Sequence, residues 1–352
     1  MLWLPRPLPD WSGAMADTAG AFPLDCLVIA NPTAGTVTEG LVREVAARCG
    51  RHTRVSVVRT RAPGDAARAA RDAVRGADRA RTGEGVRVVV AVGGDGTVLE
   101  VVNGLMDGAG PGDRAALLVV PAGTGNSGYR SHWGTRPWEE AVDTALTGLP
   151  ASLRRLDLAR VRERDALVAL GAGAGLTAEV LRSARQAPQR GRARLRAGLE
   201  HAAARFVPYP GRVSVDGTVV HEGETVLVNV GGGRHRAWQY LVLPQSELDD
   251  GLLDVCVVGS GTAPADVPAL LLTGEHVDRP GVVYRTGRSV CVERTDGLPL
   301  CFEHDGELLA DAGTRLTLDV LPGVLPVLCA PRPGPADAKR QERAGSVSEP
   351  VR

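Results

Sequence analysis

The sequence predicts a doubly wound α/β domain followed by an antiparallel β-sandwich domain. In the first half, short apolar runs alternate with runs of helical spacing, and this alternation is typical of a parallel sheet with helices on both faces. In the second half, short alternating runs are separated by Gly and Asp turns, as in antiparallel sheets. The 352 residues, of which 43% are apolar, suffice for two domains with buried cores.

The first half contains four strand-like runs separated by three helical runs. The strand-like runs are residues 26–30, 55–58, 86–92 and 115–120. The helical runs are residues 41–49, 65–74 and 97–106. In the first helical run, apolar residues recur at positions 41, 42, 45, 46 and 49, which is the spacing of one helix face. These elements predict an α/β domain over residues 23–150.

The second half changes rhythm from about residue 153. The strand-like runs are residues 213–219, 225–230, 252–258, 289–294, 300–303 and 315–321. The first of them is expected to turn back as a hairpin at Asp216 and Gly217. An Arg-rich helical insert, about residues 178–205, interrupts them. We expect a β domain over 151–332, a flexible extension over 1–22 with Met15 as an alternative start, and a disordered tail over 333–352.

Charge and lysine content limit the chemistry. The 41 basic and 41 acidic residues give zero net charge, which argues against bulk nucleic-acid binding. Lys339, in the C-terminal tail, is the only lysine. The folded body can therefore supply neither a Walker A lysine nor a Schiff-base lysine. Any phosphate chemistry must use backbone N–H groups, arginines and metal ions.

The cysteines and apolar runs indicate a cytoplasmic protein. The six cysteines are scattered without a CxxC pair, which is typical of free thiols in a reducing compartment. No apolar run approaches the ~20 residues of a membrane-spanning helix. We expect a cytoplasmic location, with any lipid contact peripheral at the inner face of the membrane.

Three Gly-rich loops follow three of the expected parallel strands. They are residues 31–35 (Asn-Pro-Thr-Ala-Gly), 93–97 (Gly-Gly-Asp-Gly-Thr) and 121–127 (Pro-Ala-Gly-Thr-Gly-Asn-Ser). Ligands of such sheets bind outside the carboxyl ends of the strands. Backbone N–H groups there suit an anion, and glycine allows phosphate oxygens to approach closely. The three loops together predict a phosphate-binding site.

Acidic side chains accompany the second loop. A carboxylate at Asp95, among phosphate-binding glycines, is costly unless a cation or a proton transfer needs it, and Mg²⁺ held with substrate phosphates fits. Glu100 and Asn103 share one face of the following helix, which faces either the site or solvent.

The loop motifs resemble those of the diacylglycerol kinase catalytic-domain family. Asn31-Pro-x-x-Gly35, Gly93-Gly-Asp-Gly-Thr97 and Pro121-x-Gly-Thr-x-Asn126 match its signature in order. The second half adds the segments 171–180, 228–233 and 250–254 and the turn 304–307, His-Asp-Gly-Glu. The match spans about residues 25–330. The family also includes bacterial lipid kinases and sphingosine and ceramide kinases, with NAD kinase a more distant relative.

The resemblance implies an NAD-kinase-like fold, ATP and Mg²⁺ as cofactors, and a lipid acceptor in a cleft between the domains, most often diacylglycerol. It also implies roles for individual residues. The ATP site would comprise Asn31, Pro32, Thr33, Gly35, Thr60, Gly93, Gly94, Asp95, Gly96, Thr97, Glu100, Gly123, Thr124 and Asn126. The general base would be Glu307 or Asp305, with Asp95 as the rival for this role. A structural Mg²⁺ would bind Asp250 and the carbonyls of Glu247 and Leu252. A carboxylate base is needed because an alcohol is a poor nucleophile near neutral pH.

Several alternatives stay open at this stage. The motif Gly123-x-Gly125-x-x-Gly128 also matches a dinucleotide fingerprint, but the acid at the expected distance, Asp143, falls in a helical run. Ser127 and Thr177 stand where many relatives have Asp, which disfavours a sphingoid acceptor and leaves reduced activity open. An NAD kinase and a non-catalytic nucleotide or lipid sensor are the rival functions.

Two further features concern partners. The arginines between residues 182 and 196 fit either anionic membrane or a solvated helix face. His235 either lines the acceptor cleft or lies in a surface turn. Relatives are often dimers, so a homodimer is a candidate assembly.

Overall fold

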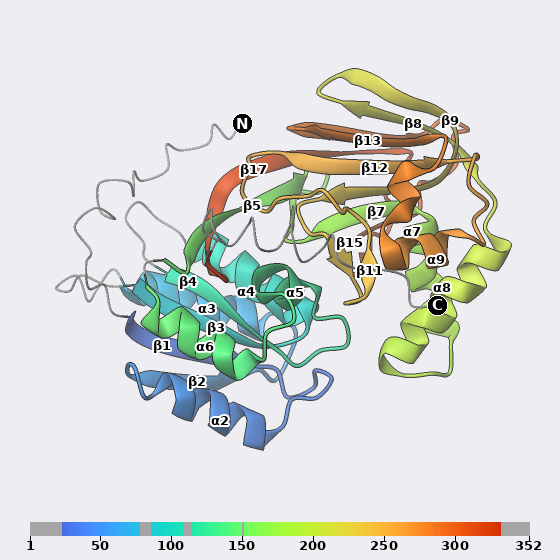
Figure 1. Cartoon of the computed structure of the whole chain (residues 1–352). Helices are drawn as coiled ribbons and strands as arrows, with labels where there is room; N and C mark the ends of the chain where they lie inside the picture. The colour runs from blue at the N-terminus through green and yellow to red at the C-terminus, as the bar shows by residue number, and fades with distance from the viewer. Residues whose placement is uncertain (1–22, 78–85, 109–114, 150, 332–352) are drawn as a thin grey trace, which may run out of the picture.

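The computed structural model describes residues 23–77, 86–108, 115–149 and 151–331. The expected flexible extension with Met15 and the expected disordered tail with Lys339 lie outside these residues. The N-terminal part is the expected α/β domain, shown in blue to green in Figure 1. Its strands are β1 (Pro23–Ala30), β2 (Val55–Arg59), β3 (Val86–Gly93) and β4 (Ala115–Pro121). They pair in parallel in the order β4-β3-β1-β2.

Helices cover this sheet. They are α2 (Glu39–Cys49), α3 (Asp65–Ala77), α4 (Asp95–Gly108), α5 (Ser127–Trp133) and α6 (Trp138–Thr147). The α2 helix begins where the Thr38 side chain accepts a hydrogen bond from the Leu41 amide, an N-cap that satisfies one of the free donors of the first turn. At Gly104 of α4 a Cβ would lie 2.1 Å from the Ala67 carbonyl oxygen, so glycine allows α3 and α4 to pack closely.

The second part is the expected antiparallel β domain. Its longer strands are β5 (Leu153–Val161), β7 (Gly171–Gly175), β8 (Tyr209–Val215), β9 (Thr218–Gly231), β12 (Leu253–Gly259), β13 (Val282–Gly287), β14 (Ser289–Arg294) and β17 (Arg315–Leu328). Short strands complete it: β6 (Ala166–Val168), β10 (His235–Arg236), β11 (Tyr240–Leu241), β15 (Phe302–His304) and β16 (Glu307–Leu308). The β8–β9 hairpin turns at Asp216 and Gly217, where both backbones have positive φ, as the sequence predicted.

The Arg-rich insert forms a helical hairpin beside the β domain. Its helices are α7 (Leu176–Gln186) and α8 (Gly191–Arg205), which pack against each other. The short helix α9 (Val267–Thr273) lies next to them (Figure 1). A 3₁₀ turn, η2 (Glu275–Asp278), follows α9. Over the described ranges, no helix combines the length and the apolar character that crossing a bilayer requires.

The last strand connects the two parts. β17 pairs with β5 and β14 in the β domain, and Val327 also pairs in parallel with Leu117 of β4. The C-terminal end of β17 thus joins the sheet of the first part, and Leu325 and Val327 are buried in that core. The expected boundary at residues 150–151 stays a prediction. All six cysteines are free, four of them buried, and none forms a disulfide.

Candidate functional site

The three Gly-rich loops meet at one cavity of about 710 Å³. They follow β1, β3 and β4, whose carboxyl ends lie at the same edge of the parallel sheet. A Cβ at Gly35 would lie 2.6 Å from the Ala122 carbonyl oxygen, and a Cβ at Gly123 would lie 2.2 Å from the Cα of Gly94. These glycines therefore let the loops touch one another. Several of the residues expected to bind ATP line this cavity: Asn31, Gly35, Gly94, Asp95, Gly96, Thr97, Glu100, Gly123 and Thr124.

Hydrogen bonds within and between the loops involve two of the other expected ATP-site residues, Thr33 and Asn126. Asn31 donates from Nδ2 to the Thr97 hydroxyl at 3.1 Å, while its Oδ1 accepts from the Thr33 amide and hydroxyl. Asn126 bonds both the amide and the carbonyl of Gly123. None of Pro32, Thr33, Thr60, Gly93 and Asn126 lines the cavity.

Two of these residues have a clear packing or backbone role. A Cβ at Gly93 would lie 2.6 Å from the Thr97 hydroxyl, so glycine makes room for a buried side chain rather than for phosphate. The Thr60 amide donates to the Ala30 carbonyl, continuing the pairing of β1 with β2.

Asp95 links the second and third loops. Its carboxylate accepts hydrogen bonds from the amides of Ser127 at 3.1 Å and Gly128 at 3.0 Å, in the first turn of α5. Burial raises the pKa of Asp95, and these two amides act against that shift. The carboxylate therefore holds α5 against α4 at the cavity wall.

Glu100 faces the cavity rather than bulk solvent. Its Oε2 accepts a hydrogen bond from the Gly64 amide at 3.0 Å, which ties the start of α3 to α4. Asn103, on the same face in the sequence pattern, instead donates to the carbonyl of Leu99 within its own helix.

The turn between β15 and β16 faces the loops from the second part of the chain. Asp305, Gly306 and Glu307 line the same cavity. The Asp305 carboxylate accepts hydrogen bonds from the Ala169 and Leu170 amides, both at 2.8 Å, and its side chain is only 1% exposed. Glu307 is exposed at the cavity. Its carboxylate is thus the better placed of the two to accept a proton from a substrate.

Two charged residues of the cavity were missed by the sequence analysis, Glu303 and Arg236. Glu303 is 3% exposed, its Oε2 accepts from the Gly306 amide at 3.0 Å, and burial raises its pKa to about 7. Its position two residues before Asp305 could have suggested a shared strand face. Arg236 lies in a short irregular strand, and no sequence signal points to it.

The helical side of the cavity is apolar. Leucine and valine side chains of α7, α8 and α9, with others of β9 and the β11 region, form this wall. They are Leu176, Val180, Leu181, Leu195, Leu199, Leu227, Val242, Val267 and Leu271. The cavity therefore joins glycine loops of the first part to a wall that suits an alkyl chain, and its volume lies in the usual range of ligand sites.

Ser127 and Thr177, which stand where many relatives have Asp, also line this cavity. The Ser127 amide bonds Asp95, and the Thr177 hydroxyl donates to Oδ1 of Asn229 at 3.1 Å. His235 does not line it, and burial, with Arg130 nearby, lowers the pKa of His235 to about 4.

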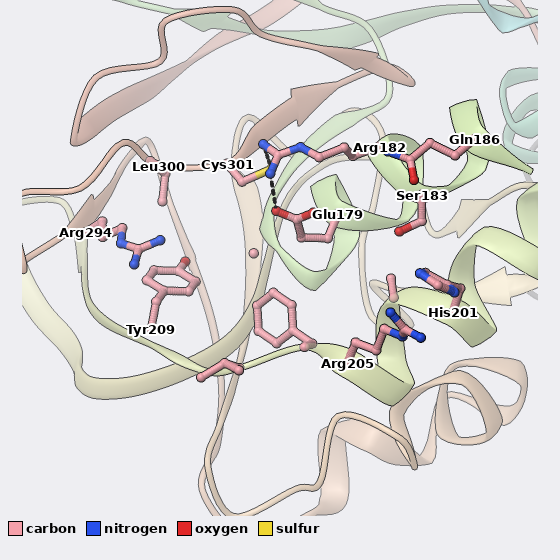
Figure 2. Close-up of a pocket in the computed structure, with 14 residues that line it drawn as sticks. Glu179, Arg182, Ser183, Gln186, His201, Arg205, Tyr209, Arg294, Leu300 and Cys301 are labelled. Carbon is pink, nitrogen blue, oxygen red and sulfur yellow. Dashed lines mark hydrogen bonds and ion pairs between the residues drawn. The ribbon is translucent and has the colours of Figure 1, made fainter.

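A second cavity of about 390 Å³ lies on the other face of the α7–α8 hairpin (Figure 2). Its polar wall includes Glu179, Arg182, Arg205 and Arg294, and Tyr209 stands among them. None of the glycine loops reaches it, so the larger cavity is the one that contains the expected phosphate-binding loops.

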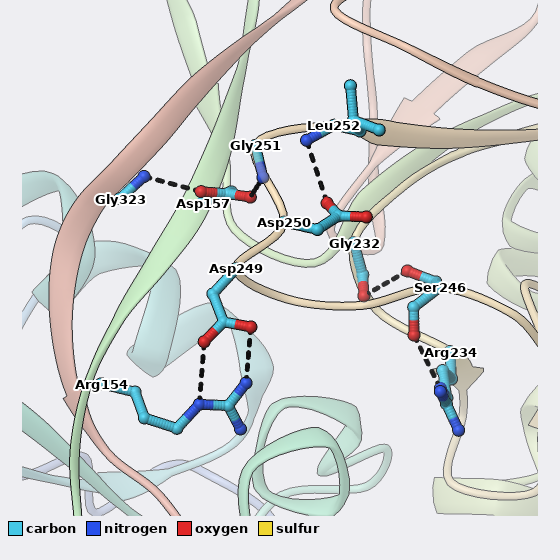
Figure 3. A network of polar contacts seen from close by, with 10 residues as sticks. All are labelled: Arg154, Asp157, Gly232, Arg234, Ser246, Asp249, Asp250, Gly251, Leu252 and Gly323. Atoms are coloured by element: carbon cyan, nitrogen blue, oxygen red, sulfur yellow. Dashed lines mark hydrogen bonds and ion pairs between the residues drawn. The ribbon is translucent and has the colours of Figure 1, made fainter. Parts of the chain in front are cut away.

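The residues of the expected structural Mg²⁺ site line neither cavity. Figure 3 shows two of them, Asp250 and Leu252. One carboxylate oxygen of Asp250 accepts from the Leu252 amide at 3.0 Å. The carbonyl oxygens of Glu247 and Leu252 would complete an all-oxygen donor set, which is what Mg²⁺ prefers. The neighbouring carboxylates have other partners. Both carboxylate oxygens of Asp249 accept hydrogen bonds from the Arg154 guanidinium, and the Asp157 carboxylate accepts hydrogen bonds from the amides of Gly251 and Gly323.

This donor set fits Mg²⁺ by its chemistry, and the site stays a prediction. Burial is the main cause that raises the pKa of Asp157, and the neighbouring carboxylates Asp250 and Asp249 raise it further. In the described part of the chain, no group of three or more His, Cys, Asp or Glu side chains could hold a metal ion. The expected site has one carboxylate and two carbonyls.

Comparison with known proteins agrees with this fold. The model of the diacylglycerol kinase catalytic domain matches residues 25–161, and that of the YegS C-terminal NAD kinase beta sandwich-like domain matches residues 171–329. The chain therefore belongs to the family of lipid kinases that combine these two domains, which confirms the resemblance and the fold class inferred from the sequence.

Individual relatives extend over most of the chain. A protein described as a probable lipid kinase YegS, from Salmonella newport, is 29% identical over 262 residues, which is 72% of this chain and 81% of the relative. The corresponding protein from Salmonella gallinarum is also 29% identical over 262 residues. A crystal structure described as a diacylglycerol kinase from Bacillus anthracis superposes with a TM-score of 0.62 at 20% identity, over 90% of this chain and 98% of that one. At this identity the structural match supports the fold alone.

Proposed function

We propose that this protein transfers the γ-phosphate of ATP to the hydroxyl of a lipid, with diacylglycerol as the acceptor and phosphatidic acid as the product. The observation that carries the proposal is the single cavity in which three glycine loops face an apolar helical wall. A soluble acceptor would not need this wall, whereas an acyl chain gains from burying itself there.

The glycine loops would hold the phosphates of ATP. Their backbone N–H groups lie at the carboxyl ends of β1, β3 and β4, and the N-terminus of α4 adds its partial positive charge. This arrangement needs no lysine, which agrees with a sequence whose only lysine is Lys339. Phosphoryl transfer depends mainly on such positioning and charge neutralisation.

Glu307 would accept the proton of the lipid hydroxyl. It is exposed at the cavity, and the turn that carries it is held in place by Asp305, whose carboxylate is committed to backbone amides. A positioned base of this kind typically contributes ~10²–10⁴-fold to the rate. Mg²⁺ bound with ATP would neutralise phosphate charge, and Asp95 at the second loop is the nearest expected carboxylate for it.

The α7–α8 hairpin would approach the membrane. Arg185, Arg190, Arg192, Arg194 and Arg196 are all exposed on it or its connecting turn. Each basic residue near an anionic membrane surface adds ~1 kcal/mol. The same helices form the apolar wall of the cavity, so a lipid leaving the bilayer would enter beside them.

Transfer of radiolabel from ATP tests this function. We expect label in diacylglycerol when diacylglycerol, sphingosine, ceramide and NAD are offered in parallel, the lipids in mixed micelles. Glu307→Gln should reduce transfer ~10²–10⁴-fold. Glu44→Gln, an exposed glutamate on α2, is the matched control and should not change the rate.

Other outcomes would change the acceptor or the function that we propose. Label in sphingosine or ceramide would keep the kinase and change the acceptor. Label in NAD alone would replace the lipid kinase with an NAD kinase. Nucleotide binding without label in any acceptor would make the protein a sensor.

A further inference from the structure

Two glycines of β7 make room for the two charged residues that the sequence analysis missed. A Cβ at Gly171 would lie 2.0 Å from Nη2 of Arg236, and a Cβ at Gly173 would lie 2.9 Å from Oε1 of Glu303. β7 pairs with β15 at Glu303 and with the end of β9 before the Arg236 turn. The motif Gly171-x-Gly173 therefore brings a guanidinium and a carboxylate onto one wall of the large cavity.

The Arg236 guanidinium has unused hydrogen-bonding capacity. Its Nη1 donates to the carbonyls of Gly233 and His235, each at 3.1 Å. Its Nε and Nη2 are buried and have no hydrogen-bond partner among the described residues. Donors in this state are costly, and a ligand oxygen would satisfy them. The residue as a whole is partly exposed and lines the cavity.

The charge of Arg236 acts on the carboxylates at the centre of the cavity. It lowers the pKa values of Asp95 and Glu303, against the larger effect of burial, yet neither carboxylate forms an ion pair with it in the described structure. Its positive charge therefore acts on both carboxylates, and no ion pair with either of them neutralises it. A guanidinium is planar and forked, and this shape matches two oxygens of a phosphoryl group.

Other arginines near the cavity either donate hydrogen bonds to backbone carbonyls or are exposed to solvent. Arg192 donates from Nε to the Thr124 carbonyl at 3.0 Å, and Arg130 donates from Nη1 to the Trp238 carbonyl at 2.6 Å. Arg194 lines the cavity but is exposed. Arg236 is thus the cation that combines burial, free donors and proximity to the carboxylates.

We propose that Arg236 binds the transferred phosphoryl group and stabilises its charge during transfer, so that it is a catalytic residue. This proposal rests on the proposed phosphoryl transfer. In the step, the lipid oxygen forms a bond to the γ-phosphorus as the bond from that phosphorus to the bridging oxygen breaks. ADP leaves with the electron pair, the hydroxyl proton goes to Glu307, and Arg236 gains or loses no bond.

Replacing the guanidinium tests this assignment. Arg236→Met keeps an unbranched stem about as long as that of arginine up to Nε and removes the charged guanidinium. We expect its kcat to fall ~10²–10³-fold, as when one preorganised donor to a transition-state oxygen is lost. The KM for the lipid should change little. Arg236→Lys, which keeps the charge without the fork, should recover part of the rate, and added guanidinium ion should partly rescue Arg236→Ala.

A matched control and a pH profile separate direct contact from indirect effects. Arg43→Met changes an exposed arginine of α2 that lines neither cavity and should leave kcat unchanged. Direct contact predicts that Arg236→Met lowers kcat equally across the pH range. If the variant keeps the wild-type maximum and only its acid limb moves, Arg236 acts through the ionisation of Glu303 and the proposal is overturned. Wild-type kcat, or loss of activity that matches a loss of folded protein, would also overturn it.

A comparison of ATP and ADP affinities tests the role of Arg236 independently of the proposed function. ATP carries the γ-phosphate and ADP does not, so Arg236→Met should weaken ATP binding, measured by calorimetry, while ADP binding stays the same. If wild-type protein labels no acceptor, the proposed function fails, but this comparison still decides whether Arg236 contacts the γ-phosphate. Equal ATP affinity in wild type and variant would refute that contact.

Discussion

Glu303→Gln should change how the stability of the protein depends on pH. In the folded chain Glu303 is 3% exposed, and burial raises the pKa of its carboxyl group from 4.5 to about 7. Arg236, the Gly306 amide and His304 act in the opposite direction, and Asp305 adds to the increase. The neutral acid is therefore the form that the fold favours.

The sign and size follow from proton linkage. Between pH 4.5 and about pH 7 the folded state binds more protons at Glu303 than the unfolded state does, so the free energy of unfolding falls as pH rises. The stabilisation is fully present below the unfolded pKa and is lost as pH rises through the folded pKa. A difference of this size in pKa corresponds to roughly 3 kcal/mol at ~1.4 kcal/mol per unit. Glutamine stays neutral, so the variant should lack this loss.

Denaturant unfolding at about pH 5 and about pH 8 measures the effect. Relative to wild type, Glu303→Gln should gain stability as pH rises, and subtracting the two curves removes groups that titrate alike in both proteins. Glu44→Gln, at an exposed position, should give a flat difference. A Glu303→Gln difference that does not vary with pH would show that the carboxyl group is ionised in the fold, and the reasoning from burial would be refuted.

Three further substitutions test other parts of the structure. Asp305→Asn should destabilise the fold by ~1–3 kcal/mol, because buried amides lose a charged acceptor, and loss of kcat with unchanged stability in urea would instead mark Asp305 as the base. Tyr209→Phe should leave the Tm unchanged or higher, because it removes a buried hydroxyl that has no partner among the described residues, and a lower Tm would contradict this. Gly123→Ala should weaken ATP binding by forcing its loop away from Gly94. Gly40→Ala, an exposed position of α2 whose Cβ would meet only the Thr38 hydroxyl at 3.6 Å, should bind ATP normally, and equal calorimetric affinities would disprove the crowding.

Much of the fold was predictable because local patterns and global structure agree here. The strand segment over residues 88–92 is continuous, apolar and buried, as a strand covered on both faces must be. The hairpin turn at Asp216 and Gly217 was predictable because both residue types tolerate positive φ. The meeting of the three glycine loops followed from the shared edge at which parallel strands end.

Several site details were not predictable from the sequence. Gly93 belongs to a phosphate-binding motif, yet its missing side chain makes room for Thr97. Asp305 has the residue type of a base, but its carboxylate is committed to the amides of residues 169 and 170, far away in the chain. Such roles depend on which backbone donors come within reach, and sequence spacing does not encode that.

The sequence by itself determined the alternation of strands and helices, the glycine loops and the absence of a lysine in the body of the chain, because each follows from residue type and local order. The tertiary structure decided which charges share the cavity. Arg236 lies against Gly171, and Glu303 against Gly173, only when β7, β9 and β15 are paired, since strand pairing brings together residues distant in the chain. The return of β17 to β4 was decided in the same way.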